Sequence, residues 1–562
     1  MYCKVTPKKY SDGKTTYFAA LVESYWDSEK KYSTQRVINK LGMVSRDQGE
    51  LLKKIYTPGI NHSELLQKLN ASPEFTTGSS LSVGHCYLLS EVWDFWKLSE
   101  CIDKYAKKTF DTRVADIIKV MTLNRCIFPC SENFLSKWYF DCEDGIKYFV
   151  PLNEKQLYYR RLYRYTTELS RIFPNIMKHL FKQLKKHIHN GKMPEKIYYD
   201  ITSTYFEGEH ICILAQFGYS RDKRSDKKQI VIALVTDQYG FPIYVEVMKG
   251  NTSDKSSVAG VVKKLRSLFK ISKCILIGDR GMISNDNFEE ITKQKLDYIM
   301  AIDRDHINSS LQNDYAEIKK LKDNKHIIIH QKQNSFLIQY NRARRKQEMN
   351  SRKNRLSTVK KRLNYLKINH GKKYKLYDTY EKICYWLGKL DAEYHCKNYY
   401  THSYNEKTKT FSFKIQNKNI KQDAQWDGYF VLQSSNPKAL TYDSINIYKG
   451  LTVVENVFKR LKSDLDVRPI YHRIAQTITG HVYMVVLAYF LEKYIEWTLK
   501  QKLNISTQTP IILKQLKRIS AVEKKHNNEL ADIDITESND YLEKILSCFN
   551  LNSIKLKKYI GK

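Results

Sequence analysis

Three acidic residues occupy positions that suit the binding of a metal ion, although they lie far apart in the sequence. Asp279 ends the apolar run 274–277, and Asp200 ends the apolar run 197–199. Both runs are typical of buried strands. Asp is also common at turns and at the N-terminal caps of helices, so a purely structural role is the alternative for each residue.

Two carboxylates that leave neighbouring strands at the same edge of a sheet can share a divalent cation. Mg²⁺ prefers oxygen ligands and keeps several waters, so two or three acids are sufficient. Pairs of such ions assist in-line attack on phosphodiesters. Asp200 and Asp279 therefore predict a site for nucleic-acid cleavage, provided that a third acid joins them.

Glu455 is the candidate for the third acid. An amphipathic helix is predicted to begin near Ser444, and at about 100° per residue one arc of it carries a single acid with an aromatic residue and two cations. This arc contains Tyr448, Leu451, Glu455, Lys459 and Lys462. The opposite side can pack on a sheet and contains Val453, Val454, Val457, Phe458 and Leu461. Tyr448, Lys459 and Lys462 could hold DNA phosphates. The alternative is an ordinary surface pair of Glu and Lys four residues apart.

The elements that must position these acids follow a regular order. Strands are predicted over 197–201, on both sides of the turn 237–240, over 274–277 and over 297–302, with helices after 252 and 285. Hairpin strands followed by crossover units indicate a mixed sheet with helices on its faces.

The remaining sequence suggests a multidomain α/β protein. The predicted parts are a small β unit (1–45), a helical DNA-binding region (46–190), a core in two pieces (191–304 and 431–500), an insertion (305–430) and a C-terminal tail (501–562) that could serve dimerisation. Within the helical region, the stretch 155–188 mixes Tyr with Arg and Lys, which suits either nucleic acid or a solvated helix face.

The composition favours a polyanionic partner. Lys and Arg total 95 against 60 for Asp and Glu, which gives a net charge of +35. Nucleic acid is the leading candidate, and a general bias toward Lys is the alternative. Cys126 and Cys130 are the only close cysteine pair, and no second pair or His cluster completes a zinc site. No signal peptide or membrane span is predicted, and the expected location is the cytoplasm, in association with the nucleoid.

The order and context of the three acids resemble those of DDE transposases, which have a ribonuclease-H-like catalytic domain. The sequence is most similar to the bacterial insertion-sequence group with a large insertion before the glutamate and a Tyr–Arg–Glu–Lys signature. Tyr448, Glu455 and Lys462 match that signature, whereas Leu451 stands at the Arg position. Lys449 and Arg460 are candidate substitutes. The segments 218–229, 250–254, 278–282, 427–433 and 461–472 also match.

This resemblance implies that Asp200, Asp279 and Glu455 are the catalytic acids and hold two Mg²⁺ ions, with Mn²⁺ as a substitute. It also implies binding of double-stranded DNA at terminal inverted repeats and at the target, cut-and-paste transposition, and a homodimer in the DNA complex. The repeat sequence would be read by the N-terminal units. Trp426 and Tyr429 are candidates to support a flipped base.

The basic loop 218–229 and the residue after Asp279 are further candidates for DNA contacts. Arg221, Arg224 and Arg280 are predicted to approach DNA. Internal salt bridges are the alternative for the loop, because Asp222 and Asp226 lie within it.

Three other functions are alternatives to transposition. A stand-alone nuclease or resolvase on the same fold would lack the insertion and the Tyr–Glu–Lys helix. A tyrosine recombinase needs an Arg-His-Arg cluster, toward which His472 and Arg473 contribute, but its mostly helical domain does not fit the strand order. A catalytically silent, transposase-derived DNA-binding protein is compatible with the chain, although all three acids are present. Nucleotide hydrolysis is not indicated, because no phosphate-binding Gly-rich loop occurs.

Overall fold

The computed structural model separates the chain into two compact units. The first contains residues 1–81, 520–536 and 557–562, and the second contains 82–519 and 537–556. The structure describes residues 1–9, 15–57, 76–207, 212–272, 274–332, 334–369, 377, 379–405, 407–526 and 529–560.

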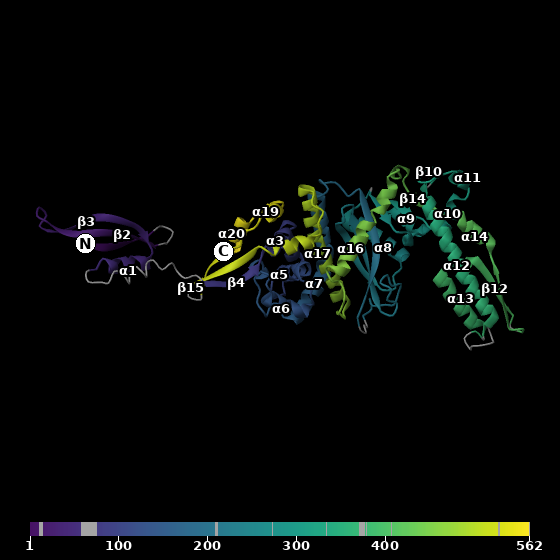
Figure 1. Ribbon diagram of the computed structural model, residues 1–562, viewed down its shortest axis with the longest axis horizontal. Helices are drawn as coiled ribbons and strands as arrows, with labels where there is room; N and C mark the ends of the chain where they lie inside the picture. Colours follow the sequence, from purple (N-terminus) through teal and green to yellow (C-terminus); the bar gives the residue numbers. More distant parts are fainter. Residues whose placement is uncertain are drawn as a thin grey trace. The chain divides into compact units, whose positions relative to one another are not determined.

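The first unit begins with an antiparallel sheet in the order β1-β2-β3, and the strands predicted near the N-terminus are present (Figure 1). Its elements are β1 (Tyr2–Lys9), β2 (Thr15–Asp27), β3 (Tyr32–Val44) and α1 (Arg46–Ile55). Ser45 caps α1, because its hydroxyl accepts the N–H of Gln48 while the Gln48 side chain accepts the N–H of Ser45. A small core of Cys3, Ala19 and Leu21 forms on the sheet, and Leu52 of α1 packs against it.

A second sheet of this unit joins distant parts of the sequence. Its order is β16-β15-β4, formed by β4 (Thr76–Ser82), β15 (Ser520–His526) and β16 (Glu529–Ile535). Asp534 on β16 forms ion pairs with Lys524, at 2.8 Å, and with Lys557, at 2.6 Å. The range predicted as a C-terminal tail therefore contributes strands to a sheet.

The second unit starts with a helical region that packs around one long apolar helix, α17. The elements are α3 (Gly84–Phe95), α4 (Leu98–Tyr105), α5 (Val114–Ile127), α6 (Glu132–Asp141), α7 (Tyr159–His187) and α17 (Ala475–Leu503). Gly480 allows α17 to approach α7 closely, because a Cβ atom there would lie 2.0 Å from the carbonyl oxygen of Thr166. The rings of Phe173 and Tyr483 stack at 4.0 Å across the same contact. Helix α17 is buried along much of its length, and among the described residues no helix is long and apolar enough to cross a membrane.

The predicted mixed sheet is also confirmed, and it has eight strands in the order β10-β11-β14-β9-β8-β5-β6-β7. The strands are β5 (Lys196–Tyr205), β6 (Gln229–Asp237), β7 (Pro242–Lys249), β8 (Ile275–Gly278), β9 (Asp297–Ala301), β10 (His326–His330), β11 (Ser335–Tyr340) and β14 (Tyr429–Ser434). β5, β8 and β9 run parallel, whereas β5-β6-β7 and the β9-β14-β11-β10 side are antiparallel. Strands from the predicted insertion thus extend the central sheet.

The rest of the insertion forms a helical lobe with its own core. Helix α12 (Arg342–Asn369) packs with α13 (Tyr380–Tyr394) around Leu363, Leu387 and Phe411 (Figure 1). The remaining elements of the second unit are α8 (Asp254–Phe269), α9 (Asn285–Lys293), α10 (Arg304–Leu311), α11 (Tyr315–Ile318), β12 (Tyr400–Asn405), β13 (Thr410–Ile415), α14 (Asn417–Ala424), α15 (Ser444–Lys449), α16 (Thr452–Ser463), α18 (Thr509–Leu516), α19 (Asp540–Ser547) and the first half of α20 (Ser553–Ile560).

Candidate active site

Strand β5 sends alternate side chains to opposite faces of the sheet, and this alternation sets the direction of Asp200. Tyr199 points to the α8 face, where its hydroxyl donates to Ser257 at 2.6 Å. Tyr198 points to the other face, where its hydroxyl donates to the carbonyl of Ile447 at 3.3 Å. Asp200 therefore shares the face that α15 and α16 cover, with the α8 helix on the other side.

Strand β8 places Asp279 at the level of Asp200. The two strands are parallel, and Tyr199 pairs with Gly278, so the next residue on each strand is an acid. Asp279 also accepts the N–H of Arg280 at 2.6 Å and caps a short 3₁₀ turn. The capping role and the position beside Asp200 are therefore compatible.

Glu455 reaches the same region from α16. The prediction of a single helix from Ser444 is wrong, because the helix is interrupted at Gly450 and Leu451, between α15 (Ser444–Lys449) and α16 (Thr452–Ser463). Gly450 lies over β5, where a Cβ atom would come within 2.2 Å of the Tyr198 hydroxyl. The predicted packing side of α16 is otherwise found, since Val454, Val457, Phe458 and Leu461 are buried and Val453 is partly buried.

These elements enclose one cavity of about 420 Å³ that all three acids line. Its other lining residues are Gln339, Asn341, Arg344, Phe430, Ile445, Tyr448, Lys449, Leu451 and Thr452. Within the described chain, the oxygens of the three acids do not all fall within 4.8 Å of one another. The cavity thus gathers the carboxylates but holds them apart.

The electrostatics of the cavity leave Asp200 without an adequate counter-charge. Burial raises the pKa of Asp200 to about 7, and the charge of Asp279 adds to the rise, while the N–H of Ile201 and the charge of Arg221 oppose it. Carboxyls that repel one another in a cavity mark a functional site, because a stabilising role would supply cations instead.

Tyr448 is the predicted DNA contact that lies closest to the acids. Its hydroxyl donates to Asp279 at 3.4 Å, and its ring lies 5.5 Å from that of Phe430. Lys459 and Arg280 are exposed. These three residues remain available to a ligand that approaches the cavity.

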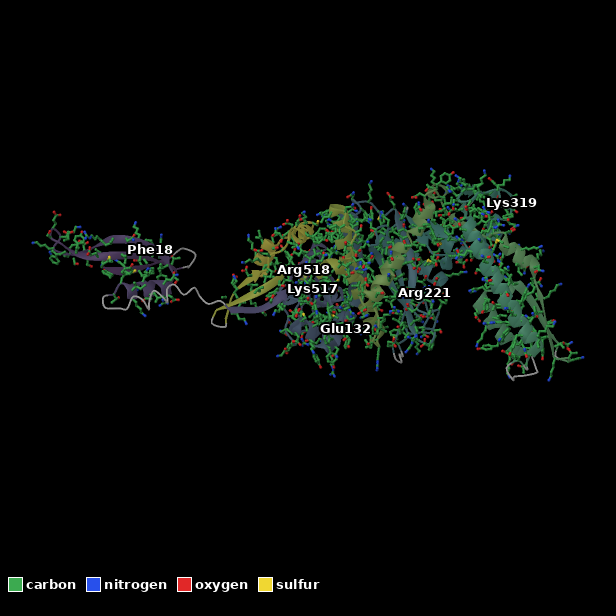
Figure 2. The ribbon with its side chains drawn as sticks, in the orientation of Figure 1. Phe18, Glu132, Arg221, Lys319, Lys517 and Arg518 are labelled. Atoms are coloured by element: carbon green, nitrogen blue, oxygen red, sulfur yellow. The ribbon has the colours of Figure 1, made fainter. Side chains whose placement is uncertain are left out.

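The other predicted DNA contacts have acidic partners. The ammonium of Lys462 lies 3.0 Å from Asp222, and Arg468 lies 3.2 Å from the same carboxylate. Arg221, labelled in Figure 2, pairs with Asp254. Arg224 pairs with Asp226 at 2.8 Å. The alternative of internal salt bridges for the loop 218–229 thus describes its contacts in this structure.

Two cations line the cavity together with Leu451, which stands at the position of the signature Arg, whereas a third cation lies elsewhere. Leu451 is buried and lines the cavity, as does Lys449. Arg460 is also buried, but it pairs with Glu492 and Glu496 away from the cavity. Arg344 from α12 lines the cavity, with its guanidinium 5.4 Å from the Phe430 ring. Sequence reasoning missed Arg344, since only the basic character of that helix hinted at it.

The two aromatic candidates from the insertion differ in exposure. Trp426 is 1% exposed and donates its indole N–H to Asn308 at 2.6 Å, so it belongs to the core and cannot support a flipped base in this arrangement. Tyr429 is partly buried, with its ring 5.0 Å from that of Tyr340.

Comparisons with known proteins address the same part of the chain. A family model described as the transposase DDE domain matches residues 194–491. A cryo-EM structure of a piggyBac transposase synaptic complex with hairpin DNA is similar with a TM-score of 0.36 and 10% identity, over 77% of each chain. No curated protein matches. Because the family match covers more than half of the 562 residues, the chain belongs to the family of proteins that carry the transposase DDE domain.

Proposed function

We propose that this protein is a DNA transposase that cuts strands at the terminal inverted repeats of an insertion sequence and transfers them into target DNA by a cut-and-paste route. The observation that carries the proposal is the convergence of Asp200, Asp279 and Glu455 on one cavity inside the family-matched range. Asp200, Asp279 and Glu455 are the proposed catalytic acids.

The donor set fits hard divalent cations. All three candidate ligands are carboxylates, and burial together with the charge of Asp279 raises the pKa of Asp200, a rise that a bound cation would oppose. Asp200, Asp279 and Glu455 would hold two Mg²⁺ ions, with Mn²⁺ as a substitute. When bound, such ions favour attack on a phosphodiester by stabilising negative charge on the attacking and leaving oxygens.

The residues around the acids can hold the DNA backbone. Tyr448 offers a hydroxyl beside Asp279, and Lys449 and Arg344 bring positive charge to the cavity wall. Phosphate contacts of this kind fix the position of a strand but carry no sequence information. We assign Lys449 and Arg344 the phosphate contact that Leu451 cannot make. Lys459 and Arg280 extend this surface. Lys462, Arg221 and Arg224 would have to exchange their acidic partners for phosphate, as would Arg344, which lies 2.9 Å from Glu348.

Several features support DNA as the substrate and a ribonuclease-H-like core. The net charge of +35 suits a polyanion. The antiparallel hairpin β5-β6-β7 followed by parallel β8 and β9 supports that fold. The DNA-bound state of the piggyBac neighbour suggests a synaptic complex, and we propose a homodimer on paired ends.

Cleavage of a duplex that carries the terminal repeat of the element tests the proposal. Wild type and Asp279→Asn are compared in Mg²⁺, with DNA binding measured in the same samples. Wild type is expected to cut, while Asp279→Asn binds but cuts at least about a thousandfold more slowly, since several kcal/mol of charge stabilisation are lost.

The same assay separates the alternatives. Equal cutting by both proteins would show that the proposed acids are wrong. Binding without cutting by wild type, in Mn²⁺ and with paired ends as well, would favour a silent DNA-binding protein. Cutting without any strand transfer would favour a stand-alone nuclease.

A further inference from the structure

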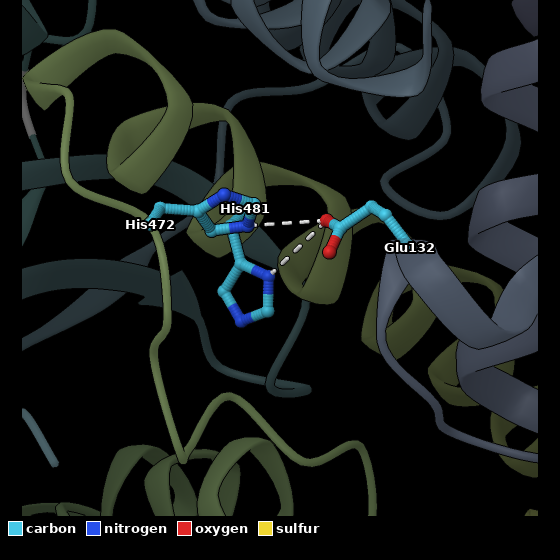
Figure 3. Close-up of side chains that lie close together, drawn as sticks. All are labelled: Glu132, His472 and His481. Carbon is cyan, nitrogen blue, oxygen red and sulfur yellow. Dashed lines mark ion pairs between the residues drawn. The ribbon is translucent and has the colours of Figure 1, made fainter. Parts of the chain in front are cut away.

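A second cluster of metal-binding side chains lies within the second unit and shares no residue with the carboxylate cavity. Glu132 is the first residue of α6, His472 lies between α16 and α17, and His481 belongs to α17 (Figure 3). Their side chains are only 8%, 5% and 5% exposed. The sequence separates Glu132 from the histidines by more than 300 residues, so only the fold reveals the group.

The geometry is close to that of a coordination sphere. The Oε1 atom of Glu132 lies 3.1 Å from Nε2 of His472 and 3.9 Å from Nδ1 of His481, and the three ligand atoms all lie within 4.8 Å of one another. Tetrahedral zinc with bonds of about 2.0–2.1 Å separates its ligand atoms by about 3.3 Å, so small side-chain movements would complete the site.

The tautomer of His481 leaves the correct nitrogen free. Nε2 lies 3.1 Å from the carbonyl oxygen of Val467, and a carbonyl only accepts, so Nε2 carries the hydrogen. Nδ1 therefore presents its lone pair toward Glu132. Histidines that ligate metals commonly donate the other ring N–H to a backbone carbonyl in this way.

The guanidinium of Arg125 lies beside the cluster and must move away when a cation binds. The Nη2 atom of Arg125 lies 3.5 Å from Nδ1 of His481, and Nη1 donates to the carbonyl of Asp466 at 3.4 Å. Both contacts are at the limit of hydrogen bonding. By contrast, Oε1 of Glu132 is buried without a well-oriented hydrogen bond. Arg125 weakly occupies the place that a cation would take.

We propose that Glu132, His472 and His481 form a binding site for a divalent transition metal, with Zn²⁺ the best fit. Two imidazoles and one carboxylate match zinc and disfavour Mg²⁺, which prefers oxygen ligands. The fourth position opens to a cavity of about 580 Å³ that Cys130, Tyr163 and Tyr471 also line, so a water completes the set. The ion would join the start of α6 to α17 and to the segment that follows α16, and its role would be to stabilise the fold.

Metal binding by the full-length protein tests this site. Asp200→Asn/Asp279→Asn chains are stripped with a chelator, titrated with Zn²⁺ and analysed for bound zinc, because the substitutions weaken the carboxylate cavity as a competing site. Glu132→Gln and His472→Gln remove one ligand each. The matched control is His189→Gln, since His189 is another buried histidine, 2.9 Å from Asp237, without a third ligand in its described surroundings.

One zinc per chain is expected in the parent and in the His189 control, with a rise in melting temperature. Glu132→Gln and His472→Gln should each weaken zinc binding at least about tenfold. Co²⁺ in the parent should give the absorption of a nitrogen- and oxygen-ligated ion without a thiolate band, and this result decides the matter if the variants do not fold. Absence of stoichiometric zinc in the parent, or binding that the two variants leave unchanged, would overturn the proposal.

Discussion

Helix α16 carries charged residues in two contrasting environments. Glu455 faces the cavity with Asp200 and Asp279, where burial and the charge of Asp279 raise the pKa of Asp200. Arg460, five residues later, is buried and pairs with Glu492, Glu496 and Asp464. The comparison teaches that charge is neutralised where the chain needs stability and left unneutralised where it awaits a ligand.

The largest effect on stability is expected from removing Arg460, which neutralises the buried acids. Arg460→Met leaves Glu492 buried without its partner and should lower the free energy of unfolding by about 3 kcal/mol, measured by denaturant titration. Burial raises the pKa of Glu492 to about 8 even beside Arg460, so the loss should be greater at pH 9, where this acid must ionise, than at pH 6.

A second substitution serves as the control for that experiment. Adding Glu492→Gln to Arg460→Met removes the uncompensated acid and should recover part of the stability. If Arg460→Met unfolds at the wild-type midpoint, the buried network does not stabilise α16 against α17.

Removing an acid from the cavity should have the opposite effect and raise the free energy of unfolding. The folded pKa of Asp200 is about 7, above the value of about 3.9 in an unfolded chain. The folded protein therefore keeps a proton that the unfolded chain loses, and stability is lost as the pH rises toward 7. Asp200→Asn should be more stable than wild type by about 2 kcal/mol at pH 8, with a smaller difference at pH 5, in urea titrations.

Repeating the urea titrations of wild type and Asp200→Asn with Mg²⁺ tests whether Asp200 binds the ion. The ion should stabilise wild type at pH 8 more than it stabilises Asp200→Asn, so the gap between them narrows. A wild type that is more stable than Asp200→Asn at pH 8 without metal would show that Asp200 is already compensated.

Substitution of Lys462 tests whether this residue stabilises the fold, as Arg460 does, or binds a ligand. Its pairing with Asp222 resembles the neutralised side, so Lys462→Met should lower the free energy of unfolding by about 1 kcal/mol. Asp222→Asn should be less than additive with it in a double-mutant cycle. A variant of unchanged stability but weaker DNA binding would instead place Lys462 with the ligand-binding residues.

Arg224 should give the smallest effect on stability. It and Asp226 are exposed, so Arg224→Gln should leave the unfolding midpoint unchanged. If Arg224 exchanges Asp226 for a phosphate, DNA affinity should fall equally for all sequences and its salt dependence should decrease by about one charge. Lys223→Gln on the same loop is the matched control for a general loss of charge.

Local patterns predicted the elements that hold the acids. Apolar runs gave the strands before Asp200 and Asp279, and the turn at Asp237 is confirmed, since its carboxylate accepts the N–H groups of Tyr239 and Phe241. The acids could be named because each follows or lies on an element with clear periodicity.

What the sequence could not predict depends on contacts between distant residues. The close approach of Gly450 to the Tyr198 hydroxyl, at the break between α15 and α16, joins residues about 250 positions apart, and no local pattern predicts such a contact. The addition of β10 and β11 to the sheet, the pairing of Lys462 with Asp222, and the meeting of Glu132 with the two histidines are all set by the tertiary fold.

The sheet β16-β15-β4 has a consequence for the timing of folding during synthesis. β4 ends at Ser82, and its partner β15 begins only at Ser520, so more than 400 residues leave the ribosome before the two can meet. Until then β4 has an unpaired edge, which is a hazard for aggregation. A chain that is released early, even one that contains every acid of the cavity, would lack β15 and leave β4 without its partner.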